Sequence, residues 1–171
     1  MKKFFLCMAA VFLIAALLLS LPLVSCLSLS NRKNPGERVL SRNALMGFVI
    51  SYTHSVNKGR VHDYYQCKDG MLVLQKTHFV SYGAGIPEAD ETEGAVFETT
   101  NDGYVISNLN RRLDKLVLAV GVIAEHAISL CSDADMQDNE VLLRTLFAPQ
   151  TSLIVEIKKV PLPVYLFSRH I

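Results

Sequence analysis

The sequence predicts a mainly β protein, a single small β-sandwich or partly closed barrel of short antiparallel strands that follows an N-terminal signal or anchor helix. Two observations support this prediction. The N-terminal segment Phe4–Leu29 contains no charged residue. After it come short runs rich in β-branched and aromatic residues, separated by turn residues at close spacing, and this pattern is typical of sandwiches and barrels.

The composition excludes several other classes of protein. The chain of 171 residues has 17 Lys and Arg against 16 Asp and Glu. Because Lys2 and Lys3 belong to the leader, the rest of the chain carries one more acidic than basic residue, unlike a strongly basic nucleic-acid-binding protein. The chain has a single long apolar segment, which excludes a multi-span membrane protein. Half of its residues are apolar, which excludes an intrinsically disordered protein.

Residues 1–25 have the organisation of an export signal. Lys2 and Lys3 form a short positive region, and the apolar run Phe4–Leu19 has the length of the hydrophobic part of a signal peptide. Extended to Leu29, the same run could also cross a hydrocarbon core of about 30 Å. We therefore assign residues 1–25 to a signal peptide or membrane anchor.

Three fates of this leader remain open. It is cleaved near Ser25, it stays as an uncleaved anchor, or it is processed as in bacterial lipoproteins, because Leu23–Cys26 matches a lipobox in which the Cys26 thiol takes a diacylglycerol. Pro22 would break the helix before the cut in either cleaved form. All three fates export the domain to the periplasm or the outer face of the cytoplasmic membrane, with a lipid or a helix as the anchor.

The other cysteines leave a second question open. If Cys26 is lipidated, Cys67 and Cys131 remain as a pair in an oxidising compartment. They form either one disulfide or two buried free thiols.

Residues 26–36 are expected to be a short polar tether with a turn at Asn34–Gly36, and residues 37–171 to be the β-rich domain. The strands are expected at residues 48–54, 61–67, 71–80, 96–100, 104–107 and 153–160. Asn101–Gly103 is the strongest hairpin signal. Hydrophobic residues alternate imperfectly along Met71–Val80, as in a strand partly buried on both faces.

The segment from Leu109 to Ala124 is ambiguous, because its apolar residues fit both helical spacing and a buried strand. Gly121 in the middle of a helix would cost about 1 kcal/mol relative to Ala. We therefore expect a helical turn over residues 110–115 and a strand over residues 116–122.

Catalytic and metal-binding patterns are weak. The five histidines are far apart and form no metal-binding motif, so we expect neither a metal nor a cofactor. His54 and Ser55 are adjacent, but neighbouring strand residues point to opposite faces, so the two side chains are not expected to act together as base and nucleophile. We therefore expect no enzymatic activity, and a hydrolase is the remaining enzymatic alternative. Asp133–Glu140 lacks the Gly and the Glu of a calcium loop. The acidic segment Glu88–Glu98 is a solvated surface or a docking site for a basic partner.

Two polar segments could bind a ligand. Ser81–Glu88 holds two glycines and a proline, so its backbone N–H groups could form a nest for an anion, or the segment is a structural Ω-loop. The adjacent arginines of Asn110–Arg112 could pair with a ligand carboxylate or with acidic residues of the same chain.

At these segments the sequence resembles the bacterial domain of unknown function 1850 family. The resemblance rests on Tyr52–Val56, Ser81–Pro87 and Asn110–Leu113, followed by Val120-Gly121 and His126, and it extends over about residues 37–158. It departs from the family where an acidic residue usually follows the first motif, since Val61-His62-Asp63 matches only loosely. Leu113–Lys115 stands where many members have a proline.

The resemblance implies a small exported or membrane-anchored protein whose gene often neighbours TRAP transporters of the TAXI class, which move organic anions. We therefore expect a non-enzymatic, membrane-tethered accessory protein with the membrane and TRAP transporter subunits as partners, and no nucleic acid. The binding or interface residues would be Tyr52, His54, Ser55, Ser81, Gly83, Gly85, Pro87, Asn110, Arg111, Arg112 and His126. The alternative is a protein that binds a small anion or carboxylate through the Gly83–Pro87 loop and Arg111 or Arg112.

Overall fold

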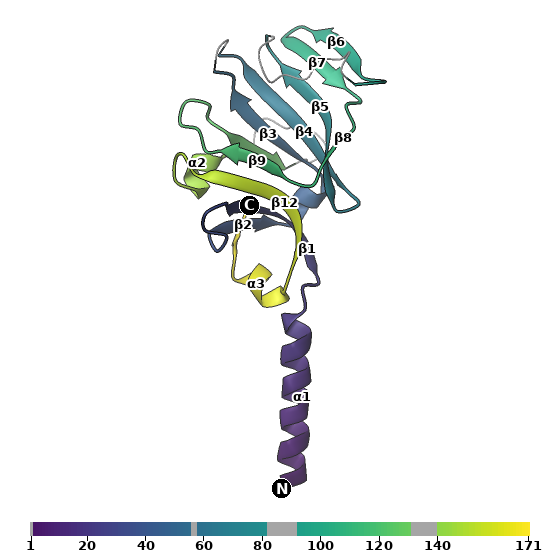
Figure 1. The fold of residues 1–171 in the computed structure, drawn as a ribbon, viewed down its shortest axis with the longest axis vertical. Helices are drawn as coiled ribbons and strands as arrows, with labels where there is room; N and C mark the ends of the chain where they lie inside the picture. The colour runs from purple at the N-terminus through teal and green to yellow at the C-terminus, as the bar shows by residue number, and fades with distance from the viewer. Residues whose placement is uncertain (1, 56–57, 82–91, 131–139) are drawn as a thin grey trace.

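Two sheets packed face to face form the domain, and one long helix leaves it at one end (Figure 1). The computed structural model describes residues 2–55, 58–81, 92–130 and 140–171. The small sheet has five strands in the order β13-β2-β1-β12-β9, and the large sheet has eight, with β11-β10-β3-β4-β5-β7-β6 in line and β8 beside β5. The predicted mainly β fold is confirmed as a sandwich that does not close into a barrel.

Helix α1, Lys2–Ser20, is the apolar segment of the leader, and all of its side chains are exposed. Its 19 residues span about 28 Å at 1.5 Å per residue, close to the thickness of a hydrocarbon core. It is the one helix in the described residues that is long and apolar enough to cross a membrane. Only Leu21, Pro22 and Leu23 separate it from strand β1.

Strand β1 corrects the expected tether over residues 26–36. The strands of the small sheet are β1 (Val24–Asn31), β2 (Arg38–Ser41), β9 (Leu116–Ala119), β12 (Ser152–Val160) and β13 (Arg169–His170). β1 lies at the centre, antiparallel to β12 from Val24↔Val160 to Asn31↔Leu153. Leu27 and Leu29 alternate with serines and are fully buried, which a solvated tether could not accommodate.

The large sheet contains most of the predicted strands. Its members are β3 (Phe48–Thr53), β4 (Arg60–Lys68), β5 (Met71–Phe79), β6 (Val96–Thr100), β7 (Gly103–Ser107), β8 (Arg111–Leu113), β10 (Ala127–Leu130) and β11 (Val141–Leu142). The β6–β7 hairpin turns at Asn101–Gly103, as predicted. Gly103 has a φ of 153°, and a Cβ there would collide with the Phe79 carbonyl oxygen, so glycine is required. Three short helices complete the fold, η1 (Asn43–Met46), α2 (Leu143–Leu146) and α3 (Leu162–Leu166).

The expected helical turn over residues 110–115 is wrong, while the strand that begins at Leu116 is confirmed in a shorter form, β9. Residues Arg111–Leu113 form β8, which pairs with Leu72–Leu74 of β5, next to the stretch of β5 that pairs with β7. The backbone reaches this edge through Asn108 and Asn110, whose positive φ values of 59° and 47° bend the chain.

A β-bulge at Gln75 explains much of the imperfect alternation along β5. Tyr64 pairs with Lys76 and Tyr65 pairs with Leu74, so Gln75 is the extra residue. Leu74 before the bulge and Thr77 after it therefore face the same side. Val73 is also buried, on the other face, as expected for a strand partly buried on both faces.

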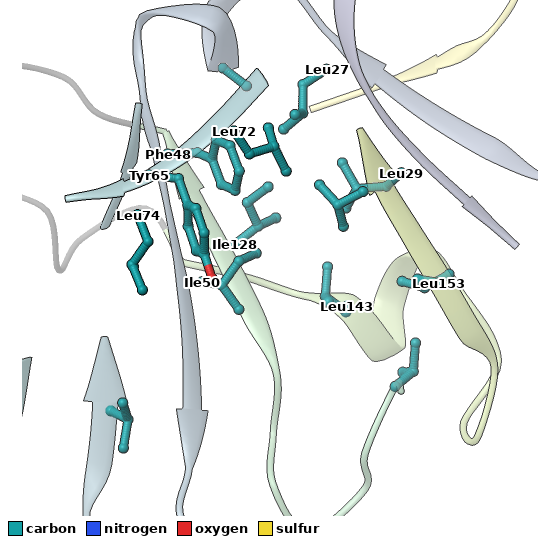
Figure 2. Close-up of a cluster of buried hydrophobic side chains, with 14 of the residues drawn as sticks. Leu27, Leu29, Phe48, Ile50, Tyr65, Leu72, Leu74, Ile128, Leu143 and Leu153 are labelled. Atoms are coloured by element: carbon teal, nitrogen blue, oxygen red, sulfur yellow. The ribbon is translucent and has the colours of Figure 1, made fainter. Parts of the chain in front are cut away.

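The core lies between the two sheets. Figure 2 shows Leu27, Leu29 and Leu153 from the small sheet pointing toward side chains of the large one. Phe48 stacks on Tyr65 with ring centroids 5.1 Å apart. The core therefore holds β3 and β4 rigidly, and these strands carry the polar side chains described next.

Candidate functional site

Polar side chains gather on both faces of the three central strands β3, β4 and β5. On the face toward the small sheet lies the inner polar cluster, made of Tyr52, Asp63, Tyr65, Thr77 and Arg111. On the opposite face lies the outer histidine cluster, made of Ser51, Arg60, His62, His78 and Glu140. The alternation of strand side chains assigns neighbouring residues to opposite clusters.

Asp63 is the central group of the inner polar cluster. It lies opposite Ile50 on one neighbouring strand and Thr77 on the other. The Thr77 hydroxyl donates a hydrogen bond of 2.8 Å to Asp63 Oδ1. Burial raises the pKa of Asp63 to about 6, and the hydrogen bond from Thr77 only partly opposes this shift. The Asp63 carboxyl group therefore gains and loses its proton near pH 6, above the ordinary range of an aspartate.

Two tyrosines flank this carboxyl group. Tyr52 is the diagonal neighbour of Asp63 on β3, and Tyr65 lies two residues further along β4. Burial, and then the negative charge of Asp63, raise the pKa of both phenols, so both stay protonated and can donate hydrogen bonds. The Tyr52 ring also stacks on His126, with centroids 5.6 Å apart.

His126 enters the cluster from the loop that follows β9. The Gly121 backbone N–H donates to His126 Nδ1 at 3.3 Å, and the Thr53 N–H donates to the Ala124 carbonyl at 2.6 Å, which fixes the loop against β3. Burial and then the positive charge of Arg60 lower the pKa of His126. The ring is therefore neutral at pH 7.

The structure separates the two adjacent arginines. Arg111 lies opposite Leu74, on the inner face, and its charge lowers the pKa of Tyr65 against the larger effect of burial. Arg112 lies opposite Val73 on the other face, with Nη2 3.6 Å from Asp69 Oδ2 in an exposed ion pair. Of the two arginines, Arg111 therefore belongs to the inner polar cluster and Arg112 does not.

The outer histidine cluster was not recognised from the sequence. Ser51, His62 and His78 form one row across β3, β4 and β5. Ser51 Oγ lies 2.9 Å from His62 Nδ1, and the two histidine rings stack with centroids 5.9 Å apart. A turn at Asp69-Gly70 alone would place His62 opposite Thr77, and the bulge at Gln75 brings His78 there instead.

Charged groups surround this row. Arg60 Nη2 pairs with Glu140 Oε2 at 2.8 Å, and Glu140 Oε1 lies 3.9 Å from His62 Nδ1. Burial is the main cause that lowers the pKa of His62. Within the described residues, His78 Nε2 is buried without a hydrogen-bond partner, since Asp102 Oδ1 is 3.7 Å away.

These contacts do not make a hydrolytic relay. In a serine hydrolase the hydroxyl and the acid approach opposite nitrogens of the histidine, whereas here Ser51 and Glu140 approach the same nitrogen of His62. Over the part of the chain that the structure describes, no group of three or more His, Cys, Asp or Glu side chains could hold a metal ion.

The family model named Domain of unknown function (DUF1850) matches residues 48–136, which is more than half of the chain. The chain belongs to this family. The DUF1850 match begins at the first residue of β3 and includes the whole inner polar cluster. It confirms the family resemblance over a shorter range than the expected 37–158. No curated protein and no solved structure matches the chain.

The predicted site residues of this DUF1850 protein lie in different parts of the structure. Tyr52 and His126 are in contact, whereas Arg111 lies on the same face of the large sheet beside Leu74, where its charge acts on Tyr65. His54 is buried and its N–H donates to the Gly59 carbonyl at 2.8 Å, so its backbone closes the turn between β3 and β4. The Ser55 carbonyl accepts a hydrogen bond from Lys58 Nζ in the same turn.

The other predicted site residues lie apart or outside the described ranges. Ser81 is exposed, just after β5. The Asn110 side-chain amide donates to the Asn108 carbonyl at 3.1 Å and so stays within its own turn. Gly83, Gly85, Pro87 and Cys131 lie outside the described residues, as do residues 88–91 of the acidic segment and residues 133–139. The pairing of Cys67 with Cys131 therefore stays a prediction.

Proposed function

We propose that this DUF1850 protein is exported and stays tethered by α1 at the outer face of the cytoplasmic membrane, as a non-enzymatic accessory protein of a TRAP-type (TAXI) organic-anion transport system. The observation that carries the tether is the fully exposed apolar helix joined by three residues to the central strand of the small sheet. The transport role rests on the family resemblance, with Arg111, the exposed member of the inner polar cluster, as the proposed contact residue.

The environment of Cys26 favours a helical anchor over a lipid anchor. The Cys26 side chain is fully buried in a small cluster with Leu40 and Val160. Its Sγ lies 3.7 Å from the Lys158 carbonyl oxygen, and burial raises the pKa of the thiol. A diacylglycerol on Sγ would have to leave this cluster, which would pull β1 away from its neighbours.

Cleavage before Cys26 would also remove the first pairs of the sheet. Val24 pairs with Val160 and Ser25 pairs with Lys159, so both residues are part of the folded domain. The intact mass of the protein from membranes tests the anchor. A chain that keeps α1 supports the proposal, and a diacylated N-terminal Cys26 would refute it.

The accessory role is tested by membrane pulldown and by transport. Arg111 is the exposed side chain of the inner polar cluster, so it is the member of the cluster that a partner can reach. We expect the wild-type protein to recover a TRAP transporter subunit from detergent-solubilised membranes and Arg111→Ala to recover less. Arg112→Ala is the matched control, because that side chain lies on the opposite face. A deletion strain with unchanged uptake of organic anions, together with pulldowns that recover no transporter subunit, would refute the role.

A second candidate function is favoured by the position of Arg111. The exposed Arg111 lies on the same face as Tyr65, whose phenol stays protonated, and a guanidinium can bind a small carboxylate through charge and hydrogen bonds. Binding to the folded state raises the melting temperature by mass action, so a thermal-shift screen of carboxylates measures it. A shift seen in the wild type and in Arg112→Ala, but lost in Arg111→Ala, supports this function, and equal responses in all three proteins contradict it.

A further inference from the structure

The end of the domain next to α1 exposes large apolar side chains. Phe167 is 91% exposed, Leu166 is 61% exposed and Leu162 is 41% exposed, all in or directly after α3. Leu23, in the link between α1 and β1, is 71% exposed. We call these residues, with Leu21, the basal apolar surface.

Strand register places the two parts of this surface at the same level. Val24 at the start of β1 pairs with Val160 at the end of β12, and α3 begins two residues after Val160. α1 and α3 are in contact. Figure 1 shows α3 beside the upper end of α1, at the base of the domain. If α1 crosses the bilayer, α3 therefore lies where the helix leaves the hydrocarbon core.

Basic side chains lie just above the basal apolar surface. Lys158 and Lys159 are exposed and pair in register with Cys26 and Ser25. At about 3.3 Å per residue, Lys159 stands roughly 7 Å along the strand from the residue that follows β12. Lys158 Nζ pairs with Glu156 at 2.7 Å, which leaves Lys159 as the more available charge of the two.

This layering matches the chemistry of a membrane interface. Apolar side chains beside the end of a spanning helix fit the acyl boundary, and lysines a few ångströms farther out fit the phosphates of anionic headgroups. A partner protein or a second copy of this chain would have to share this space with the bilayer itself.

We propose that α3 and Phe167 form a second membrane contact, inserted into the interface of the bilayer that α1 crosses, with Lys159 at the headgroup phosphates. The proposal rests on the proposed retention of α1. Two contacts on the same bilayer, one spanning and one interfacial, fix the orientation of the domain relative to the membrane.

The absence of tryptophan from the chain gives a direct test. In Phe167→Trp the new side chain is the only indole in the protein. The full chain is placed in vesicles of phosphatidylcholine and phosphatidylglycerol that contain lipids brominated in the acyl chains. We expect blue-shifted emission and bromine quenching several-fold stronger than in a control variant.

Ile123→Trp is the matched control, because Ile123 is 76% exposed on the loop after β9. That loop follows Ala119, which pairs with Ser152 at the far end of β12 from Val160. Eight residues of strand separate the two ends, roughly 26 Å. The Ile123→Trp protein should therefore emit as in water and show little quenching.

The outcomes separate this proposal from the anchor. Equal quenching in the two tryptophan variants overturns the interfacial contact. Blue-shifted but unquenched emission of Phe167→Trp, lost when the protein is diluted in lipid, also overturns it and indicates contact between copies. Adding Lys159→Gln to Phe167→Trp should reduce quenching in anionic vesicles and leave it unchanged in pure phosphatidylcholine. Intact mass on the same samples reports separately whether α1 is retained.

Discussion

Asp63→Asn should stabilise the folded protein at neutral and alkaline pH. The folded-state pKa of Asp63 is about 6, against an ordinary value of 3.8. The difference of roughly 2 units corresponds to about 3 kcal/mol at 1.36 kcal/mol per unit. The asparagine keeps the shape of the neutral acid, and its Oδ1 can still accept the hydrogen bond from Thr77.

The sign of the effect follows from proton linkage. Between pH 3.8 and 6 the folded state binds more protons than the unfolded state, so the wild type loses stability as the pH rises through this window and levels off above it. Asp63→Asn lacks this loss. The variant should therefore match the wild type below pH 4 and exceed it by up to about 3 kcal/mol above pH 6.

Urea unfolding of the full chain in detergent, followed by circular dichroism at several pH values, measures this difference. Asp69→Asn is the control, because that side chain is 67% exposed and should change stability little at any pH. Parallel pH profiles for the wild type and Asp63→Asn would refute the buried carboxyl as their cause.

Three further predictions concern the fold and the anchor. Leu29→Ala removes a fully buried side chain from β1 and should cost about 2–5 kcal/mol in the same urea assay, whereas Leu23→Ala, in the exposed link, should cost little; equal losses would contradict the central position of β1. Gly103→Ala should lower the melting temperature by several degrees because its Cβ meets the Phe79 carbonyl, and Gly36→Ala, which has room for a methyl group, should not; similar melting temperatures would disprove the steric requirement. Cys26→Ala should stay in the membrane fraction after carbonate extraction, and its release would show that Cys26 carries the anchor.

Local signals in the sequence predict much of the large sheet. Asn101–Gly103 and Asp69-Gly70 specify two hairpins, because Gly supplies the backbone conformations that tight turns need. β1 was missed although Leu27-Ser28-Leu29-Ser30 alternates as a strand does, since the segment adjoins an apolar leader and its partner, β12, lies near the other end of the chain. Pairings between segments so far apart leave no local trace.

The candidate site depends even more on register than the strands do. The sequence predicts Tyr52, Arg111 and His126 as binding or interface residues, but whether they share a face depends on pairings that no single segment encodes. One residue, Gln75, decides that His62 faces His78 rather than Thr77. A bulge of this kind follows from the packing of the whole sheet, so the outer histidine cluster could be found only in the folded structure.

In the exported protein that we propose, the pairing of β1 with β12 also determines when the domain can fold. β1 is the first part of the domain to follow the leader, and its partner lies 132 residues later at the Cys26–Lys158 contact. The small sheet therefore cannot close until nearly the entire chain is available for pairing. Until then Leu27 and Leu29 of β1 stay exposed, and the unpaired edge of β1 is open to other strands. Under the proposed export, folding of this protein would thus be coupled to the completion of its own translocation.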